Sequence, residues 1–227
     1  MKIPSSFVQL LAVVAVVAAP STASAQSWTQ WTSGGAGAFN GLLFGSAVTF
    51  AGGNIDGQLF NGGGSSFDAT NYFNPPNAYN QAGLTVPGLG MIRFNGASAV
   101  NTVTFANAVV NPYFAFVSVG QPGLPVTYSF NAPFSVLSNN NNPNCAFWGC
   151  GTYSLGTNSF TGNEFSGTIQ FLGTFSSLTF STTPGEFWHG FTVGADESVV
   201  PEPATMSLLA TGLIGMAAAR RRRKRVA

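Results

Sequence analysis

The chain has 227 residues, a length that fits one domain or two small ones. Charged residues make up only 7% of it, and residues 26–203 contain seven acids but a single cation, Arg93, for a net charge of −6. A nucleic-acid-binding function is excluded because phosphate contacts need clustered Lys and Arg. Disorder is excluded because 21 Phe and 4 Trp supply the apolar area of a packed core.

Residues 1–25 have the three parts of a secretory signal peptide. Lys2 gives the positive start, residues 7–19 form an apolar run, and a small-x-small site, Ala-Ser-Ala, ends at Ala25. We expect the export translocon to receive this segment and signal peptidase to remove it. The predicted mature chain begins at Gln26.

Residues 26–195 predict an all-β ectodomain. Residues 100–110 and 125–130 alternate between apolar side chains and Thr or Ser, which is typical of antiparallel strands with one dry face. Residues 113–119 are apolar on both faces and predict a central strand. Further strands are expected at residues 42–50, 91–94, 167–172, 177–180 and 191–193. About eight or nine strands with turns between them indicate a β-sandwich or jelly-roll-like fold.

The two cysteines, Cys145 and Cys150, are predicted to form a disulfide. Two thiols that share an oxidising compartment usually pair, and the four residues between these two would form a tight loop. Phe147 and Trp148 lie in that loop and would be held either outward or against the core. Zinc is not expected because two cysteines without nearby histidines make a poor site.

Residues that could carry catalysis are few. His189 is the sole histidine, it lies among apolar residues, and no G-x-S-x-G elbow accompanies it, so we expect a structural role. Paired carboxylates for glycoside hydrolysis would have to come from acids in turn or Gly-rich segments, where solvated side chains are expected. Those acids are Asp56, Asp68, Glu164 and Glu186. We predict no catalytic residues and no enzyme activity.

One loop segment offers hard oxygen ligands of the kind that calcium prefers. Asp56 and Asp68, with Asn54 and Asn61, lie within residues 52–68, although the spacing does not match an EF-hand loop. Asp56 and Asp68 are therefore calcium candidates. No other cofactor or metal is predicted.

Aromatic residues in predicted loops suggest carbohydrate binding. Exposed rings beside amide side chains stack on sugar rings and hydrogen-bond to their hydroxyls, whereas loop rings can also simply cap a core. Trp148, Tyr72 and Tyr79 are the candidate contacts, and Trp28 and Trp31 are also placed outside clear strands.

The C-terminal part of the sequence predicts a membrane stop. Residues 196–200 form a solvated linker, and residues 204–219 carry no charge. As a helix those residues would span ~24 Å, a little under the ~30 Å of bilayer hydrocarbon. The cations that follow would stay cytoplasmic and fix the C-terminus inside. They are Arg220, Arg221, Arg222, Arg223, Lys224 and Arg225.

Residues 200–225 resemble the PEP-CTERM sorting signal of proteins exported by Gram-negative bacteria. Pro201, Glu202 and Pro203 occupy the positions of the named motif, and the apolar helix and the basic cluster follow in the same order. The resemblance implies that an exosortase in the inner membrane recognises residues 201–225 and processes the chain near the motif. It also implies delivery to the cell surface or to extracellular polymer, with Glu202 as a recognition residue. Residues 167–194 are also similar to the closing strands of β-rich PEP-CTERM ectodomains.

Three functions remain open from the sequence. The first is a non-catalytic surface or matrix protein, held transiently in the inner membrane and then sorted by the exosortase. The second is a carbohydrate-binding β-sandwich module acting on exopolysaccharide. The third is a secreted hydrolase.

Overall fold

The computed structural model describes residues 26–35, 37–52, 58–60, 71–88, 90–197 and 212. The predicted signal peptide, the calcium candidates Asp56 and Asp68, and the sorting segment at 201–225, apart from Gly212, lie outside the described residues. Within the part that is described, no helix is long and apolar enough to cross a membrane.

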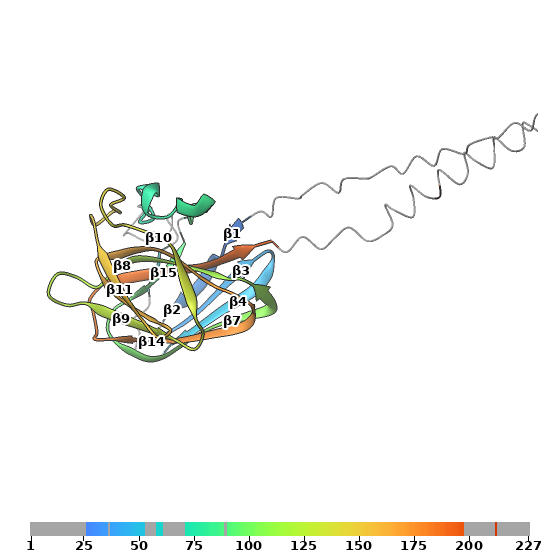
Figure 1. Cartoon of the computed structure of the whole chain (residues 1–227). Coiled ribbons are helices and arrows are strands. Elements are labelled where there is room, and N and C mark those ends of the chain that lie inside the picture. Colours follow the sequence, from blue (N-terminus) through green and yellow to red (C-terminus); the bar gives the residue numbers. More distant parts are fainter. Residues whose placement is uncertain are drawn as a thin grey trace, which may run out of the picture.

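Two antiparallel sheets lie face to face and form a β-sandwich (Figure 1). The seven-stranded sheet has the order β10 (Phe134–Asn139), β13 (Phe165–Phe171), β8 (Tyr113–Val119), β15 (His189–Asp196), β6 (Met91–Phe94) and β5 (Gln58–Phe60), with β1 (Gln26–Trp28) paired to β15. The eight-stranded sheet has the order β11 (Thr152–Gly156), β12 (Ser159–Asn163), β9 (Val126–Phe130), β14 (Thr174–Thr183), β7 (Ser98–Val110), β4 (Ser46–Gly52), β3 (Ala38–Leu43) and β2 (Gln30–Gly35).

Phenylalanine rings fill the space between the sheets. Phe114 of β8 lies 6.0 Å, ring centre to ring centre, from Phe180 of β14, and Phe50 of β4 lies 5.4 Å from Phe191 of β15. Both pairs are edge-to-face, the arrangement that the ring quadrupoles favour. Burial of each such side chain contributes roughly 1.5–3 kcal/mol, so this main core is what joins the two sheets.

The central strand β8 is buried on both faces, as predicted, because a second core covers the outer face of its sheet. Phe114 and Phe116 point into the main core, whereas Ala115 and Val117 belong to the second core. Residues 71–88, which include two short 3-10 helices, η1 (Pro76–Ala78) and η2 (Gln81–Gly83), supply part of the cover. The side chains that do so are Tyr72, Phe73, Ala78, Tyr79 and Val86. The outer face of this sheet therefore carries a layer on which loop residues can be positioned.

The all-β prediction is confirmed, but the predicted number of strands was too low: the described residues contain fifteen. Residues 42–50 were expected to form one strand and instead contain the turn of a hairpin, with Phe44 and Gly45 at positive φ (52° and 74°) between β3 and β4. Strands β11 and β12, TYSLG and SFTGN, were missed because Ser, Thr and Gly dominate them. Backbone pairing of β11 with β12, and of β12 with β9, rather than an apolar pattern, makes them strands.

The ectodomain also extends one residue beyond its predicted end. Asp196 was assigned to the linker, but it closes β15, where it pairs with Gln26 of β1 and accepts a hydrogen bond from the Tyr113 hydroxyl at 2.9 Å. Burial, followed by the contact with Asp196, raises the pKa of Tyr113 to about 12. Both ends of the described body thus meet on neighbouring strands, β1 and β15 (Figure 1).

Candidate functional site

Four aromatic side chains from three separate segments meet above the second core, and we call them the aromatic cluster: Tyr72, Phe147, Trp148 and Trp188. The Tyr72 ring lies 5.1 Å from Phe147, 4.9 Å from Trp188 and 6.3 Å from Trp148, on which it stacks. Trp148 also meets Trp188 edge-to-face at 5.6 Å. Phe147 and Trp148 are 42% and 51% exposed, so the cluster presents ring surface to solvent.

The loop that carries Phe147 and Trp148 is closed at its base. The predicted disulfide is present between Cys145 and Cys150. Inside it, Ala146 and Gly149 exchange two backbone hydrogen bonds of 2.9 and 3.0 Å. The buried Asn140 donates from Nδ2 to the Gly149 carbonyl at 3.1 Å. The two rings therefore project outward from a short, cross-linked turn, which is one of the two placements expected from the sequence.

Tyr79 cannot serve as a surface contact for a carbohydrate, contrary to the prediction. It is 0% exposed, and its hydroxyl donates to the Phe116 carbonyl at 3.1 Å. Burial raises the pKa of this phenol well above its ordinary value. Its ring meets Phe73 edge-to-face at 5.2 Å, so it supports the second core beneath the aromatic cluster.

Trp28 and Trp31 were placed outside strands and in fact lie in β1 and β2. Trp31 is buried, and its Nε1 donates to the Thr192 hydroxyl at 3.1 Å. Trp28 packs against the second core and donates from Nε1 to the Thr85 carbonyl at 3.1 Å. Neither indole nitrogen remains available for a ligand in this arrangement.

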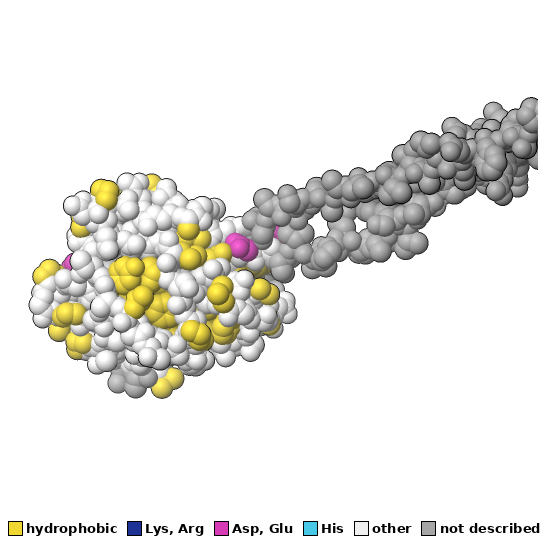
Figure 2. Space-filling view, viewed as in Figure 1, with side chains coloured by type: hydrophobic (Ala, Val, Ile, Leu, Met, Phe, Trp, Pro, Cys, Tyr) yellow, Lys and Arg dark blue, Asp and Glu magenta, His cyan; other side chains and the backbone are white. Residues whose placement is uncertain are grey.

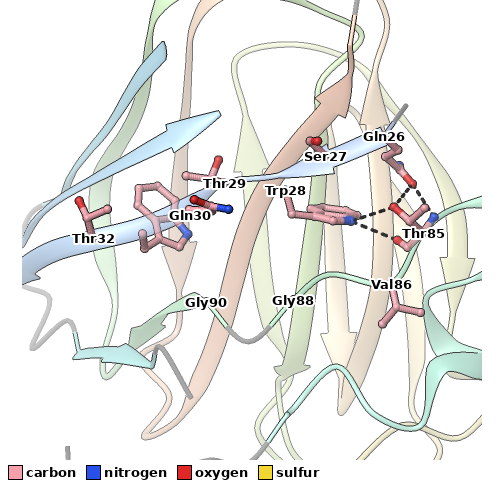
Figure 3. Close-up of a pocket in the computed structure, with 11 residues that line it drawn as sticks. Gln26, Ser27, Trp28, Thr29, Gln30, Thr32, Thr85, Val86, Gly88 and Gly90 are labelled. Carbon is pink, nitrogen blue, oxygen red and sulfur yellow. Dashed lines mark hydrogen bonds between the residues drawn. The ribbon is translucent and has the colours of Figure 1, made fainter. Parts of the chain in front are cut away.

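An open pocket of about 750 Å³ lies beside these two tryptophans (Figure 3). Its lining carries no charged side chain among the described residues: it combines the indoles with amides, hydroxyls and glycine backbone. Figure 3 shows Gln26, Trp28 and Thr85 joined along one edge by hydrogen bonds. The pocket is suited to a neutral, hydroxyl-bearing molecule better than to an ion.

Glu186 and Glu164, the two acids considered for glycoside hydrolysis that the structure describes, are not fully solvated as expected. Glu186 is only 3% exposed, and its Oε2 accepts the backbone N–H of Gly120 at 2.7 Å. Glu164 is partly buried, and its Oε2 accepts from the Ser118 hydroxyl at 2.7 Å. Burial, and secondarily the nearby Glu186, raises the pKa of the Glu164 carboxyl. The turn-rich sequence around Glu164 and Glu186 predicted that both side chains are exposed to solvent. In the fold, their carboxylates instead accept hydrogen bonds from Ser118 and Gly120, at the end of β8 and just after it.

His189 is a core residue at the start of β15, as predicted. Its ring stacks on Phe94 at 5.2 Å with 7° between the planes, and Nδ1 lies 3.0 Å from Oε2 of Glu186. This contact does not align as a hydrogen bond, and neither ring nitrogen has a hydrogen-bond partner among the described residues. Phe187, two residues before His189, precedes the strand and is 73% exposed.

Within the described ranges, no group of three or more His, Cys, Asp and Glu side chains could hold a metal ion. The calcium hypothesis concerns Asp56 and Asp68, which are not among those residues, and it stays a prediction.

Sequence reasoning missed Trp188 as a member of the aromatic cluster. It adjoins the core residue His189, and nothing in its local sequence links it to Tyr72 or Trp148, which are far away along the chain. Only the packing of residues 71–88 over the sheet brings the three together.

Comparisons with known proteins locate one feature. Residues 199–223 match the family described as the PEP-CTERM protein-sorting motif. The chain has no match among curated proteins and none among solved structures. The match overlaps residues 200–225, which resemble this signal, at positions 200–223, and it implies exosortase-dependent sorting of an exported protein. The β-sandwich body is thus the exported part of a chain that carries a PEP-CTERM sorting motif.

Proposed function

We propose that this protein is a non-catalytic component of the cell surface or extracellular matrix, released from the inner membrane by an exosortase. The observation that carries the proposal is the sorting motif at residues 199–223. In this pathway residues 204–219 cross the inner membrane transiently, and the cationic cluster at 220–225 keeps the C-terminus in the cytoplasm of a Gram-negative cell.

Export begins with removal of residues 1–25 by signal peptidase. This cleavage point is compatible with the pairing of β1, because Gln26, Ser27 and Trp28 pair with Asp196, Ala195 and Gly194 of β15. Cleavage before Gln26 keeps all three of these pairs. A cut within the strand would remove ladder partners of β15.

The surface chemistry of the body supports a role in a hydrated, neutral polymer. The face in Figure 2 has small areas of Asp or Glu and broad areas of uncharged polar and apolar side chains. Outward residues of neighbouring strands in the eight-stranded sheet are also uncharged and polar. Thr49 pairs with Thr104, and Thr127 pairs with Thr161. Charges are few on this surface, although residues 26–203 have a net charge of −6, so most of the contacts it offers to a polymer come from hydroxyl, amide and apolar groups.

The test of sorting uses one acid inside the motif and one just outside it. We expect Glu202→Ala and deletion of the exosortase each to leave the protein in the inner-membrane fraction with its C-terminal segment still attached. Glu197→Ala is the matched control, because Glu197 precedes the matched residues, and it should be processed normally. Fractionation and intact mass read out both effects. Normal processing and location of Glu202→Ala would refute the proposal.

A second candidate function is binding of neutral polysaccharide by the aromatic cluster. The supporting observation is the convergence of two exposed rings, Phe147 and Trp148, with Tyr72 and Trp188 behind them. Large rigid rings bury much area at little cost in side-chain entropy, and the faces of sugar rings are apolar. The disulfide holds the loop in place before a ligand arrives, which lowers the entropy cost of binding.

Trp148→Ala tests this second function directly. Affinity electrophoresis in gels of neutral glucan, galactan or mannan should show the variant retarded about ten-fold less strongly than the native protein, as expected for loss of a binding hot spot. Leu155→Ala is the control, because Leu155 is 61% exposed and lies on β11 of the other sheet. Equal mobility of the native protein and Trp148→Ala in every gel would refute glycan binding at this cluster.

A further inference from the structure

The side chain of Gln26 is used by the fold in an asymmetric way. Its carbonyl oxygen, Oε1, accepts hydrogen bonds from both the backbone N–H and the hydroxyl of Thr85, the latter at 2.7 Å. Its amide nitrogen, Nε2, is buried and has no hydrogen-bond partner among the described residues. A buried amide nitrogen without a hydrogen-bond partner lowers the stability of the fold. The carbonyl oxygen of this carboxamide therefore stabilises the fold, whereas its nitrogen destabilises it.

Gln26 is also the residue that becomes the N-terminus if the leader is cleaved as in the proposed function. A terminal glutamine holds an α-amine and a γ-carboxamide within one residue, at the separation that gives a five-membered ring. Intramolecular reactions of this kind have a large advantage over bimolecular ones because the reacting groups are already joined.

We propose that the mature N-terminus is closed as a pyroglutamyl residue formed from Gln26. The neutral α-nitrogen forms a bond to Cδ, the Cδ–Nε2 bond breaks, and a proton passes from the α-nitrogen to Nε2, which leaves as ammonia. The step balances without an oxidant, a reductant or any other reactant.

The reaction keeps the side-chain carbonyl oxygen, which is hydrogen-bonded in the fold, and removes the side-chain nitrogen, which is not. The carbonyl oxygen of Gln26 remains in the lactam as an acceptor of the kind that Thr85 binds. The departing nitrogen is the atom without a partner. No hydrogen bond of the amide nitrogen to described residues has to break for it to leave.

Ring closure also changes the charge at the pocket of Figure 3. Gln26 lines that pocket together with Ser27, Thr32 and Thr85, all of them uncharged. A free N-terminus would add an ammonium to this rim, whereas the lactam is neutral. The closed ring also lacks the primary amine that aminopeptidases require, which protects a chain that resides outside the cell.

The experiment is peptide mass spectrometry of the mature protein recovered from the cell surface or medium. Trypsin should release the peptide 26–93, because Arg93 is the first cation after the leader. We expect this peptide to be lighter than the encoded sequence by one ammonia, unreactive toward amine-labelling reagents, and open to sequencing only after pyroglutamyl aminopeptidase treatment.

Two variants sharpen the result. Asn at position 26 is one methylene too short to form the lactam, so Gln26→Asn should keep a reactive α-amine and its full mass. Gln30→Asn makes the same change in β2, the next strand along the chain, and this variant should still lose ammonia at residue 26.

The possible failures are distinguishable. A first residue other than Gln26 overturns the leader cleavage and this inference together. A peptide that begins at Gln26 with full mass and a free amine overturns this inference alone and leaves the proposed export intact. Loss of ammonia through an ester that joins Gln26 to Thr85 also overturns it, because that product keeps its α-amine.

Discussion

Replacement of Tyr128 by Phe should make the protein more stable, although it deletes a polar atom from the core. Tyr128, in β9, is 0% exposed, and its hydroxyl has no hydrogen-bond partner among the described residues. Its ring stacks on Phe160 at 5.3 Å with 3° between the planes and on Phe180 at 5.5 Å. Burial raises the pKa of this phenol well above its ordinary value, so the group stays neutral.

The expected magnitude follows from the cost of an unpaired buried hydroxyl. Leaving such a group without a partner costs ~1–3 kcal/mol, which the Phe variant avoids. The small void left by the missing oxygen offsets a little of that gain in stability. We expect the free energy of unfolding to rise by about 1 kcal/mol, which for a domain of this size raises Tm by about 2–4 °C. The ring contacts are unchanged because only the oxygen is removed.

Tyr79→Phe is the matched control because it makes the same chemical change at an equally buried site. There the hydroxyl donates to the Phe116 carbonyl at 3.1 Å, so its removal should lower the free energy of unfolding by about 1 kcal/mol. Urea denaturation of the oxidised mature protein, followed by tryptophan fluorescence, measures both. If Tyr128→Phe is destabilised as much as Tyr79→Phe, the hydroxyl of Tyr128 has a partner and the reasoning fails.

Three further changes test other parts of the structure. The folded-state pKa of Glu164 is raised, so its charge opposes folding at neutral pH; Glu164→Gln should raise urea stability at pH 7, and the gain should fade as pH falls toward the ordinary Glu pKa of 4.5. An unchanged gain at low pH would contradict the assigned cause. Replacing Cys145 and Cys150 by Ser opens a loop of sequence separation 5 and should cost about 2 kcal/mol in the same assay, whereas no loss would mean that the loop is held by other contacts. Gly167→Ala places a methyl group against the backbone carbonyl of Ser138, so we expect a lower Tm, and an unchanged Tm would show that β10 can shift.

Part of the fold could be predicted because its signal is local. Residues 113–119, which are apolar apart from Ser118, form a strand inside a sheet, and the alternating residues 126–130 form a strand with one buried face. The disulfide followed from two cysteines in an exported chain. Hydroxyl-rich strands such as β11 escaped prediction because hydrogen bonds to a neighbouring strand, which no local pattern records, hold them in place.

The candidate site could be predicted only in part. Trp148 and Tyr72 were identified and do lie together, at 6.3 Å. The prediction of Tyr79 as a carbohydrate contact was wrong, and Trp188 was missed as a member of the aromatic cluster. The reason is that the burial of an aromatic residue depends on which distant segment covers it.

The sequence by itself determined where the protein is sent and which class of fold is sent there. The sorting motif is read as a linear segment, and strand periodicity is a property of neighbouring residues, so neither needs tertiary information. Only the tertiary structure decided which polar and aromatic groups are exposed. Glu186 precedes β15 in a turn that looks solvated, yet the fold buries it beside His189. The physical reason is that burial is set by long-range packing of one sheet and its covering loops on another.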